Sequence, residues 1–199
     1  MTLDDLPTPC LVLDLGILKR NLARMQAATA RPPGLVLRPH MQTAKSLEVA
    51  KLAAPHHGPI TVSTLAEARY FMGGGYIEQI YAVGITPQKL DAVAALNAQG
   101  GHVKIITDDP DVADAIVAHP GPLRALIEVD CGEGRGGIAP DSDALLHIAA
   151  RLGKHCLGVM THAGHSYAAR SLEERETVAE AEHRGAVLAA ERLRGAGTK

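Results

Sequence analysis

A dense group of polar side chains follows the aliphatic run "GLVLR" at residues 34–38. The stretch "LRPHMQTAKS" contains Arg38, His40, Gln42, Thr43 and Lys45. A guanidinium and an imidazole bind anionic groups, and a lysine amine is a nucleophile when its environment lowers its pKa. We therefore predict that this stretch contributes to a binding or active site.

A second candidate is the glycine-rich string "VDCGEGRGGI", in which Gly132, Gly134, Gly136 and Gly137 surround Arg135. Its spacing differs from the G-x-G-x-x-G that opens a helix in dinucleotide-binding folds, so it does not indicate a dinucleotide. Two interpretations stay open. Arg135 binds a ligand, or it is a solvated residue of a glycine-rich turn.

The third candidate is "GVMTHAGHSY", which places His162, His165 and Tyr167 in one short loop. Cys156 is nearby in the chain, but no further ligand follows at a spacing typical of zinc sites, so we expect no metal site here. An imidazole that stacks on a ring and a phenol that donates a proton fit these residues better. The alternative for each histidine is an ordinary polar loop residue.

Short aliphatic runs alternate with segments of helical period, which predicts an α/β fold with parallel strands covered on both faces. The expected strands are 10–14, 34–38, 59–63, 79–83, 102–107, 123–130 and 156–160. The expected helices are 15–29, 45–54, 65–75, 87–101, 110–119, 142–153 and 172–197. The period fits either a closed β/α barrel or an open doubly wound sheet, and both place ligands at the carboxyl ends of the strands.

Composition narrows the class of protein. The 199 residues have 46% hydrophobic content and a net charge of −2, with no basic patch, so we expect no nucleic-acid partner. The three cysteines are scattered, which argues against a disulfide framework. Neither an export signal nor an apolar run long enough to cross a membrane is evident, so we expect a cytoplasmic protein. No linker divides the chain, and we expect one domain.

Several strings together resemble a known family. "LPTPCLVLD", "LRPH", "ITVSTLAEARYF", "IYAVGITPQKL", "VDCGEGRGGI" and "GVMTHAGHSY" are similar to the D-threonine aldolase and D-serine dehydratase group. The resemblance implies pyridoxal 5'-phosphate as cofactor and a TIM-type barrel of the alanine racemase N-terminal type. Residues 1–199 would form this barrel domain, truncated after about six of its eight units. The C-terminal β-domain, with the divalent metal of the family, would lie outside this chain.

The resemblance also implies roles for individual residues. Arg135 resembles the arginine that steadies the phenolic oxygen of the cofactor, and His162 resembles the imidazole that lies against its ring. Tyr167 resembles the active-site tyrosine near the phosphate or substrate. His40 and Thr43 line the strand end that carries the cofactor lysine in the family, as Arg38 does.

The family motif reads R-P-H-x-K-T-H-K, and its first lysine forms the Schiff base with the cofactor. Aligned on Arg38, that position is Gln42, whose amide is not a nucleophilic amine. Lys45 matches the second lysine of the motif. On a strand it would face the opposite side from Gln42, and in a helical turn it would lie one turn away, so we interpret Lys45 as a bystander.

Three functions remain open from the sequence. The first is a lyase that acts on small D-β-hydroxy amino acids, closest to D-threonine aldolase, which yields glycine and acetaldehyde from D-threonine. The second is a D-serine dehydratase-like deaminase, with racemase-like activity a weaker variant. The third is a non-catalytic pyridoxal-phosphate-binding remnant, because Gln42 replaces the lysine. The resemblance further implies a homodimer.

Overall fold

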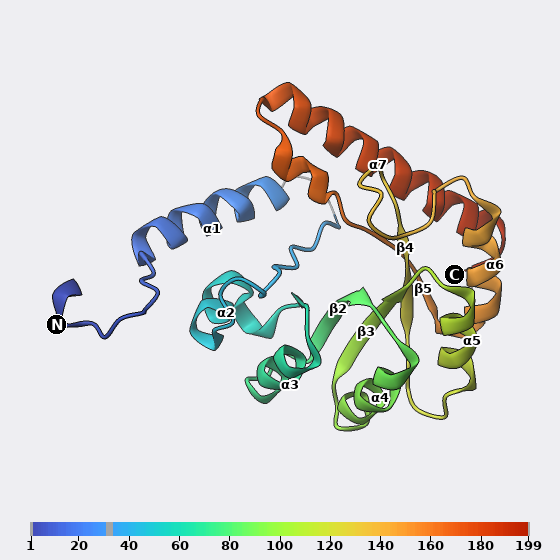
Figure 1. The fold of residues 1–199 in the computed structure, drawn as a ribbon, viewed down its shortest axis with the longest axis horizontal. Coiled ribbons are helices and arrows are strands. Elements are labelled where there is room, and N and C mark those ends of the chain that lie inside the picture. Colours follow the sequence, from blue (N-terminus) through green and yellow to red (C-terminus); the bar gives the residue numbers. More distant parts are fainter. Residues whose placement is uncertain (1, 31–33, 199) are drawn as a thin grey trace.

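The computed structural model describes residues 2–30 and 34–198. Within these ranges the chain forms one parallel sheet with the strand order β1-β2-β3-β4-β5. The strands are β1 (Ile60–Val62), β2 (Glu78–Gly84), β3 (His102–Thr107), β4 (Ala125–Val129) and β5 (Cys156–Thr161). Consecutive strands are spatial neighbours throughout this sheet (Figure 1). The predicted α/β fold with parallel strands is confirmed.

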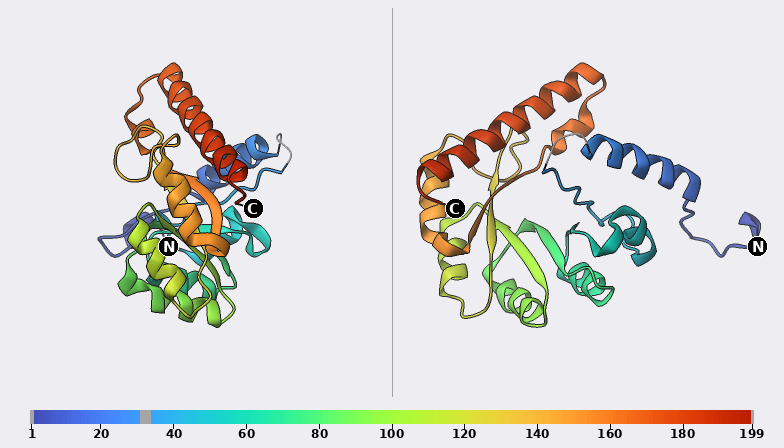
Figure 2. Two further views of the ribbon diagram at one scale, coloured as in Figure 1. Left: turned by 90° about the vertical axis from the view of Figure 1, so that its right-hand side faces the viewer. Right: turned by 180° about the vertical axis from the view of Figure 1, so that it is seen from behind.

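Helices connect the strands, and all of them except the first pack around the sheet (Figures 1 and 2). They are α1 (Leu15–Thr29), α2 (Leu47–Ala53), α3 (Leu65–Gly73), α4 (Leu90–Ala98), α5 (Pro110–Ala118), α6 (Asp143–Leu152) and α7 (Leu172–Gly195). Short 3-10 turns lie at η1 (Leu3–Asp5), η2 (Pro55–His57), η3 (Pro87–Lys89), η4 (Gly153–His155) and η5 (Gly164–Ala168). None of the helices described is long and apolar enough to span a membrane.

The helix boundaries follow the capping residues of the sequence. The carboxylate of Asp109 accepts hydrogen bonds from the amides of Asp111 and Val112, and Pro110 begins α5. In the expected helix 87–101, Thr86 precedes the 3-10 turn η3, and α4 begins after that turn. Ser142 caps α6 in the same way as Asp109 caps α5. These local contacts determine where the helices begin. They thereby also limit where the preceding strands end.

The core lies between the sheet and the outer helices. In β4, Ala125, Ile127 and Val129 alternate with half-buried neighbours and pack in one apolar cluster with Leu145 and Ile148 of α6. Burial of an aliphatic side chain of this size contributes about 1.5–3 kcal/mol. The prediction that both sheet faces are covered is wrong for the described residues, because Glu128 on the opposite face of β4 is half-buried and borders a cavity. That open face is available for a ligand.

Two predicted strands are absent from the sheet. The segment 10–14 has no regular structure, and Leu11 is fully exposed. It precedes α1, which buries none of its residues and projects from the body of the molecule (Figures 1 and 2). An aliphatic run forms a strand only where a neighbouring strand supplies hydrogen bonds, and 10–14 has no such neighbour among the described residues.

The segment 34–38 also lacks strand assignment, although the chain beyond it runs beside β1. The Thr61 amide donates to the Pro39 carbonyl at 2.9 Å, and the Met41 amide donates to the Thr61 carbonyl at 2.9 Å. Only one parallel bridge forms, between His40 and Thr61. Proline has no amide hydrogen to donate, which limits the ladder at this edge. The structure therefore has five assigned strands where the sequence predicts about six barrel strands.

Candidate functional site

A cavity of about 800 Å³ opens at the carboxyl ends of the strands. The predicted residues that border it are His40, Gln42, Thr43, Arg135, His162 and Tyr167. They come from three separated parts of the chain, and the parallel sheet brings them together because its strands all end at the same edge. Arg38 borders the cavity as well, whereas two residues of the predicted motifs, Lys45 and His165, do not.

The first motif ends in a tight turn. Met41 is almost completely buried, and residues 41–44 form a turn closed by a hydrogen bond from the Lys45 amide to the Met41 carbonyl, at 2.9 Å. Gln42 and Thr43 lie on the exposed side of this turn, at the cavity. Of the two arrangements considered from the sequence, the structure has the turn, so Gln42 and Lys45 are displaced by about one turn.

The hydrogen bonds of His40 fix its tautomer. Its Nδ1 accepts from the Gln42 amide at 3.2 Å, so in the neutral ring the hydrogen is on Nε2, which lies 3.3 Å from Ser63 Oγ. Burial lowers the pKa of His40, with the charge of Glu67 opposing that shift and the charge of His162 adding to it. The neutral imidazole therefore connects the turn at Gln42, within the first motif, to Ser63 at the end of β1.

Lys45 is turned away from the cavity by its backbone and by an ion pair. It has a left-handed φ of 46°, and its Nζ lies 3.1 Å from Oε1 of Glu67 in α3. The Glu67 side chain is only 7% exposed, and its Oε2 accepts from the Ser63 amide at 2.9 Å. Burial raises the pKa of Glu67, but the Ser63 hydrogen bond and Lys45 outweigh burial and hold this pKa below its usual value.

The glycine-rich loop is organised by Asp130. One oxygen of its carboxylate accepts hydrogen bonds from the amides of Gly132 at 2.9 Å and Gly134 at 3.1 Å, which lower the pKa of Asp130. Gly132, Gly134 and Gly137 all have φ in the left-handed region, where a side chain is strained. The loop thereby presents Arg135, whose side chain is 60% exposed and whose Nη1 lies 3.9 Å from Glu133 Oε1.

Two carboxyl groups that the motifs did not single out border the same cavity, Asp108 after β3 and Glu128 in β4. Asp108 accepts a hydrogen bond from the Gly137 amide at 2.7 Å. Burial, together with the negative charge of Asp108, raises the pKa of Glu128. Glu128 was missed because, within an aliphatic run, only the strand register decides whether a side chain faces the helices or the cavity.

The third motif supplies one wall of the cavity. The rings of His162 and Tyr167 meet edge to face, with centroids 6.4 Å apart, and His162 Nε2 lies 3.8 Å from Glu133. Tyr167 is 85% exposed, so its hydroxyl is free to reach a ligand. His165 does not border the cavity. No group of His, Cys, Asp and Glu in the described ranges is arranged to hold a metal ion.

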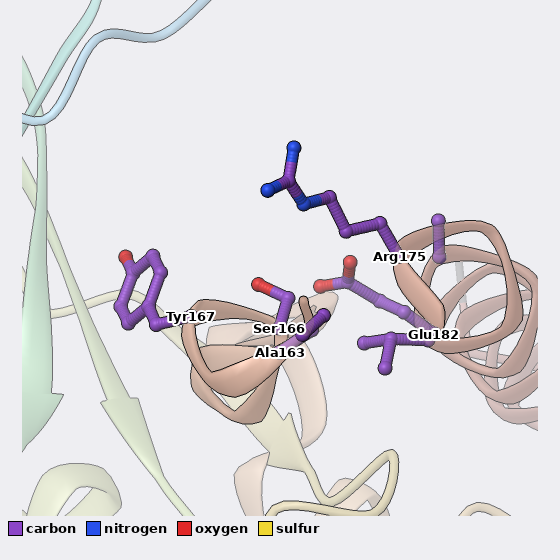
Figure 3. A pocket seen from close by; sticks show the side chains of 8 residues that line it. Ala163, Ser166, Tyr167, Arg175 and Glu182 are labelled. Atoms are coloured by element: carbon purple, nitrogen blue, oxygen red, sulfur yellow. The ribbon is translucent and has the colours of Figure 1, made fainter. Parts of the chain in front are cut away.

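A second cavity, of about 540 Å³, lies between η5 and α7. Figure 3 shows the Tyr167 ring on one side of this cavity, with Arg175 and Glu182 of α7 on the other. Glu182 accepts a hydrogen bond from Thr161 Oγ1 at 2.7 Å, which ties α7 to the end of β5. Tyr167 borders both cavities. Residues from each of the three motifs border the first cavity.

Comparisons with known proteins identify relatives of the whole described fold. D-threo-3-hydroxyaspartate dehydratase of Delftia sp. is 40% identical over 98% of the chain and 54% of its own length. D-threonine aldolase of Arthrobacter sp. is 33% identical over 96% of the chain and 52% of its own length. A solved alanine racemase-like protein of Idiomarina loihiensis superposes with a TM-score of 0.93 at 38% identity, over 98% of the chain and 53% of that protein.

The chain thus spans about half the length of these relatives. The resemblance to the D-threonine aldolase and D-serine dehydratase group, which rested on the motifs, is confirmed. The matching family model is described as "Alanine racemase, N-terminal domain" and aligns with residues 13–199. The chain therefore belongs to the alanine racemase N-terminal domain family.

Proposed function

We propose that this chain forms the ligand-binding barrel of a lyase lineage that acts on small D-β-hydroxy amino acids with pyridoxal phosphate, in a reaction like that of D-threonine aldolase. The observation that carries the proposal is the convergence of His40, Arg135, His162 and Tyr167, from three separate motifs, on one cavity. Two relatives are named for lyase reactions of D-threonine and D-threo-3-hydroxyaspartate, which supports this substrate class.

The residues present fit non-covalent binding of the cofactor. Arg135 would hold an anionic oxygen of the ring, and the His162 imidazole would lie against the ring. Tyr167 and Thr43 would supply hydroxyl groups for the phosphate or the amino acid. Bound pyridoxal phosphate supplies an electron-withdrawing ring that stabilises negative charge at the α-carbon of an amino acid.

The same residues do not fit covalent attachment of the cofactor. Gln42 stands at the cavity where the family motif has its reactive lysine, and a carboxamide nitrogen is not a nucleophilic amine. Lys45 is paired with Glu67 and lies outside the cavity lining. On this proposal, the chain would bind its ligands without covalent catalysis by a lysine of residues 2–30 or 34–198.

A dehydratase reaction is the second candidate. It is supported by the 40% identity to the Delftia dehydratase, which is above the 33% identity to the Arthrobacter aldolase. Aldolase activity breaks the bond between Cα and Cβ and releases an aldehyde, whereas dehydration removes the β-hydroxyl and ends in ammonia and a keto acid. The two products separate these candidates.

The test restores the amine. The full-length protein and its Gln42→Lys variant are incubated with pyridoxal phosphate, reduced with borohydride and mapped by mass spectrometry. We expect no adduct in the wild type and an adduct at position 42 in the variant, together with cleavage of D-threonine or dehydration of D-3-hydroxyaspartate. Gln42→Met is the matched control. An inactive, unmodified Gln42→Lys protein, with cofactor and divalent metal supplied, would contradict the proposal.

A further inference from the structure

We propose that the cavity binds a preformed phosphopyridoxyl–amino acid conjugate, in which the cofactor carbon is already bonded to the amino nitrogen, in preference to free pyridoxal phosphate. The inference rests on the proposed function and specifies the ligand of that same site. It follows from two observations: no lysine amine of the described residues borders the cavity, and several hydrogen-bonding side chains do.

The first step is the position of the amines. No lysine in residues 2–30 and 34–198 borders the cavity. Lys89 donates to the Tyr81 hydroxyl at 2.9 Å, and Lys104 pairs with Glu78, so both amines have partners outside the cavity lining. An aldehyde that enters the cavity therefore meets no ε-amine of the described chain, and free pyridoxal phosphate gains no covalent bond.

The second step is that Lys45 cannot readily replace the missing amine. Turning Lys45 toward the cavity would break its 3.1 Å contact with Glu67. The Glu67 carboxylate is buried and held in place by the Ser63 amide, so it could not follow Lys45 and would lose this cation. Leaving a buried carboxylate unpaired is costly, which keeps Lys45 in its observed position.

The third step concerns what the conjugate adds. Ser63 Oγ lies 3.3 Å from His40 Nε2–H and accepts that hydrogen, which leaves the hydroxyl hydrogen of Ser63 for a ligand oxygen. Ser63, Thr43 and Arg135 all border the cavity. The carboxylate and hydroxyl of an attached amino acid can accept hydrogen bonds from these groups, whereas the aldehyde of the free cofactor offers one oxygen.

The cavity is also large enough for the larger ligand. Its volume of about 800 Å³ lies in the range of sites that enclose whole small molecules. The amide of Gln42, at the border of this cavity, can hydrogen-bond to the conjugate without forming a bond to carbon. Substrate and cofactor would thus enter as one molecule, and the lysine of the family motif would not be needed for their binding.

The experiment uses isothermal titration calorimetry on the full-length protein. The probes are the stable secondary amine made by borohydride reduction of pyridoxal phosphate with D-threonine, the same conjugate of L-threonine, pyridoxal phosphate alone and D-threonine alone. We expect the D-conjugate to bind about tenfold or more tightly than pyridoxal phosphate alone, because it adds charge-assisted hydrogen bonds. The L-conjugate should bind more weakly than the D-conjugate.

Variants make the result specific. Gln42→Lys should shift the binding preference toward pyridoxal phosphate and form a borohydride-trapped adduct at position 42. The control Gln42→Met, which has an unbranched side chain without an amine, should form no adduct. Ser63→Ala should weaken the D-conjugate by about tenfold and pyridoxal phosphate less, as expected for loss of a hydrogen bond to a charged group. Circular dichroism and thermal melting check that each variant is folded.

The outcomes separate this inference from the proposed function. Equal affinity of the wild type for pyridoxal phosphate and the D-conjugate, or a trapped adduct on a wild-type lysine, overturns the inference. A wild type that does not bind the D-conjugate, beside a Gln42→Lys variant that captures pyridoxal phosphate, also overturns it but leaves the proposed function standing. A Gln42→Lys variant that neither captures the cofactor nor acts on substrate contradicts the proposed function itself.

Discussion

Lys45 Nζ lies 3.1 Å from Oε1 of Glu67, and this ion pair joins the turn after the first motif to helix α3. Its two members differ in environment, since the side chain of Lys45 is 57% exposed and that of Glu67 is 7% exposed. The pair thus holds the one lysine of the motif outside the cavity that Gln42 borders. Lys45, which the sequence offers as a substitute for the missing amine, is instead paired with Glu67.

Replacement of Glu67 by glutamine should destabilise the fold in a pH-dependent manner. The variant keeps an acceptor for the Ser63 amide but loses the ion pair, at a cost of about 1–2 kcal/mol in the free energy of unfolding near neutral pH. The pKa of Glu67 is lowered by folding. Its contribution is therefore present above the unfolded-state pKa and is lost as the pH falls through the folded-state pKa.

Urea denaturation of both proteins at several pH values measures this difference. We expect the two unfolding free energies to converge in acid. Glu48→Gln is the matched control, because Glu48 pairs with Lys51 on the surface and its side chain is 81% exposed. That control should change stability by less than about 0.5 kcal/mol. If the difference in unfolding free energy between Glu67→Gln and wild type stayed constant down to acid pH, the ion pair would not be its cause.

Replacement of Glu128 by glutamine should have the opposite pH dependence. Burial and the charge of Asp108 raise the pKa of Glu128, so its ionisation is less favourable in the folded state than in the unfolded chain. The wild type therefore loses stability relative to the variant as the pH rises from the ordinary carboxyl pKa through the raised value. We expect Glu128→Gln to be more stable than wild type at neutral pH and similar to it in acid.

The same urea series tests this expectation. Asp108→Asn gives an independent check, because removing the neighbouring charge should lower the pKa of Glu128 and reduce the benefit of Glu128→Gln in the double variant. If Glu128→Gln were equally destabilising at all pH values, the carboxyl group would have a structural role that its surroundings do not indicate.

Two glycines of the Arg135 loop should tolerate alanine very differently. A Cβ at Gly137, where φ is +94°, would lie 2.7 Å from the backbone nitrogen of Asp130. At Gly134, where φ is +69°, the same atom meets nothing within 4 Å. We expect Gly134→Ala to cost about 1 kcal/mol from backbone strain alone, and Gly137→Ala about 2 kcal/mol more because the backbone must move.

Thermal and urea unfolding of the two variants measure this difference, with Gly134→Ala as the control for Gly137→Ala. The Gly137 amide also donates to Asp108 at 2.7 Å, so displacement of this residue should disturb the cavity as well as the fold. Ligand affinity should fall more in Gly137→Ala than in Gly134→Ala. Equal losses of stability would mean that the close approach at Gly137 is relieved at little cost.

Much of the architecture could be predicted from local patterns. The aliphatic runs at 59–63, 79–83, 102–107 and 156–160 correspond to β1, β2, β3 and β5, because the side of each strand that packs against the helices needs apolar side chains. Asp109 and Pro110 mark the start of α5 because capping is a contact between near neighbours in the chain. Pattern alone failed at 10–14, where strand formation depends on a distant partner.

The sequence by itself determined the family, the α/β order of elements and the absence of a lysine at position 42, since motif identity and hydrophobic period are properties of the chain. Only the tertiary structure decided that Lys45 pairs with Glu67 and that Glu128 faces the cavity. Both depend on strand register and on helix placement across gaps of many residues. Side-chain partners at such distances are set by packing in three dimensions, which no local pattern encodes.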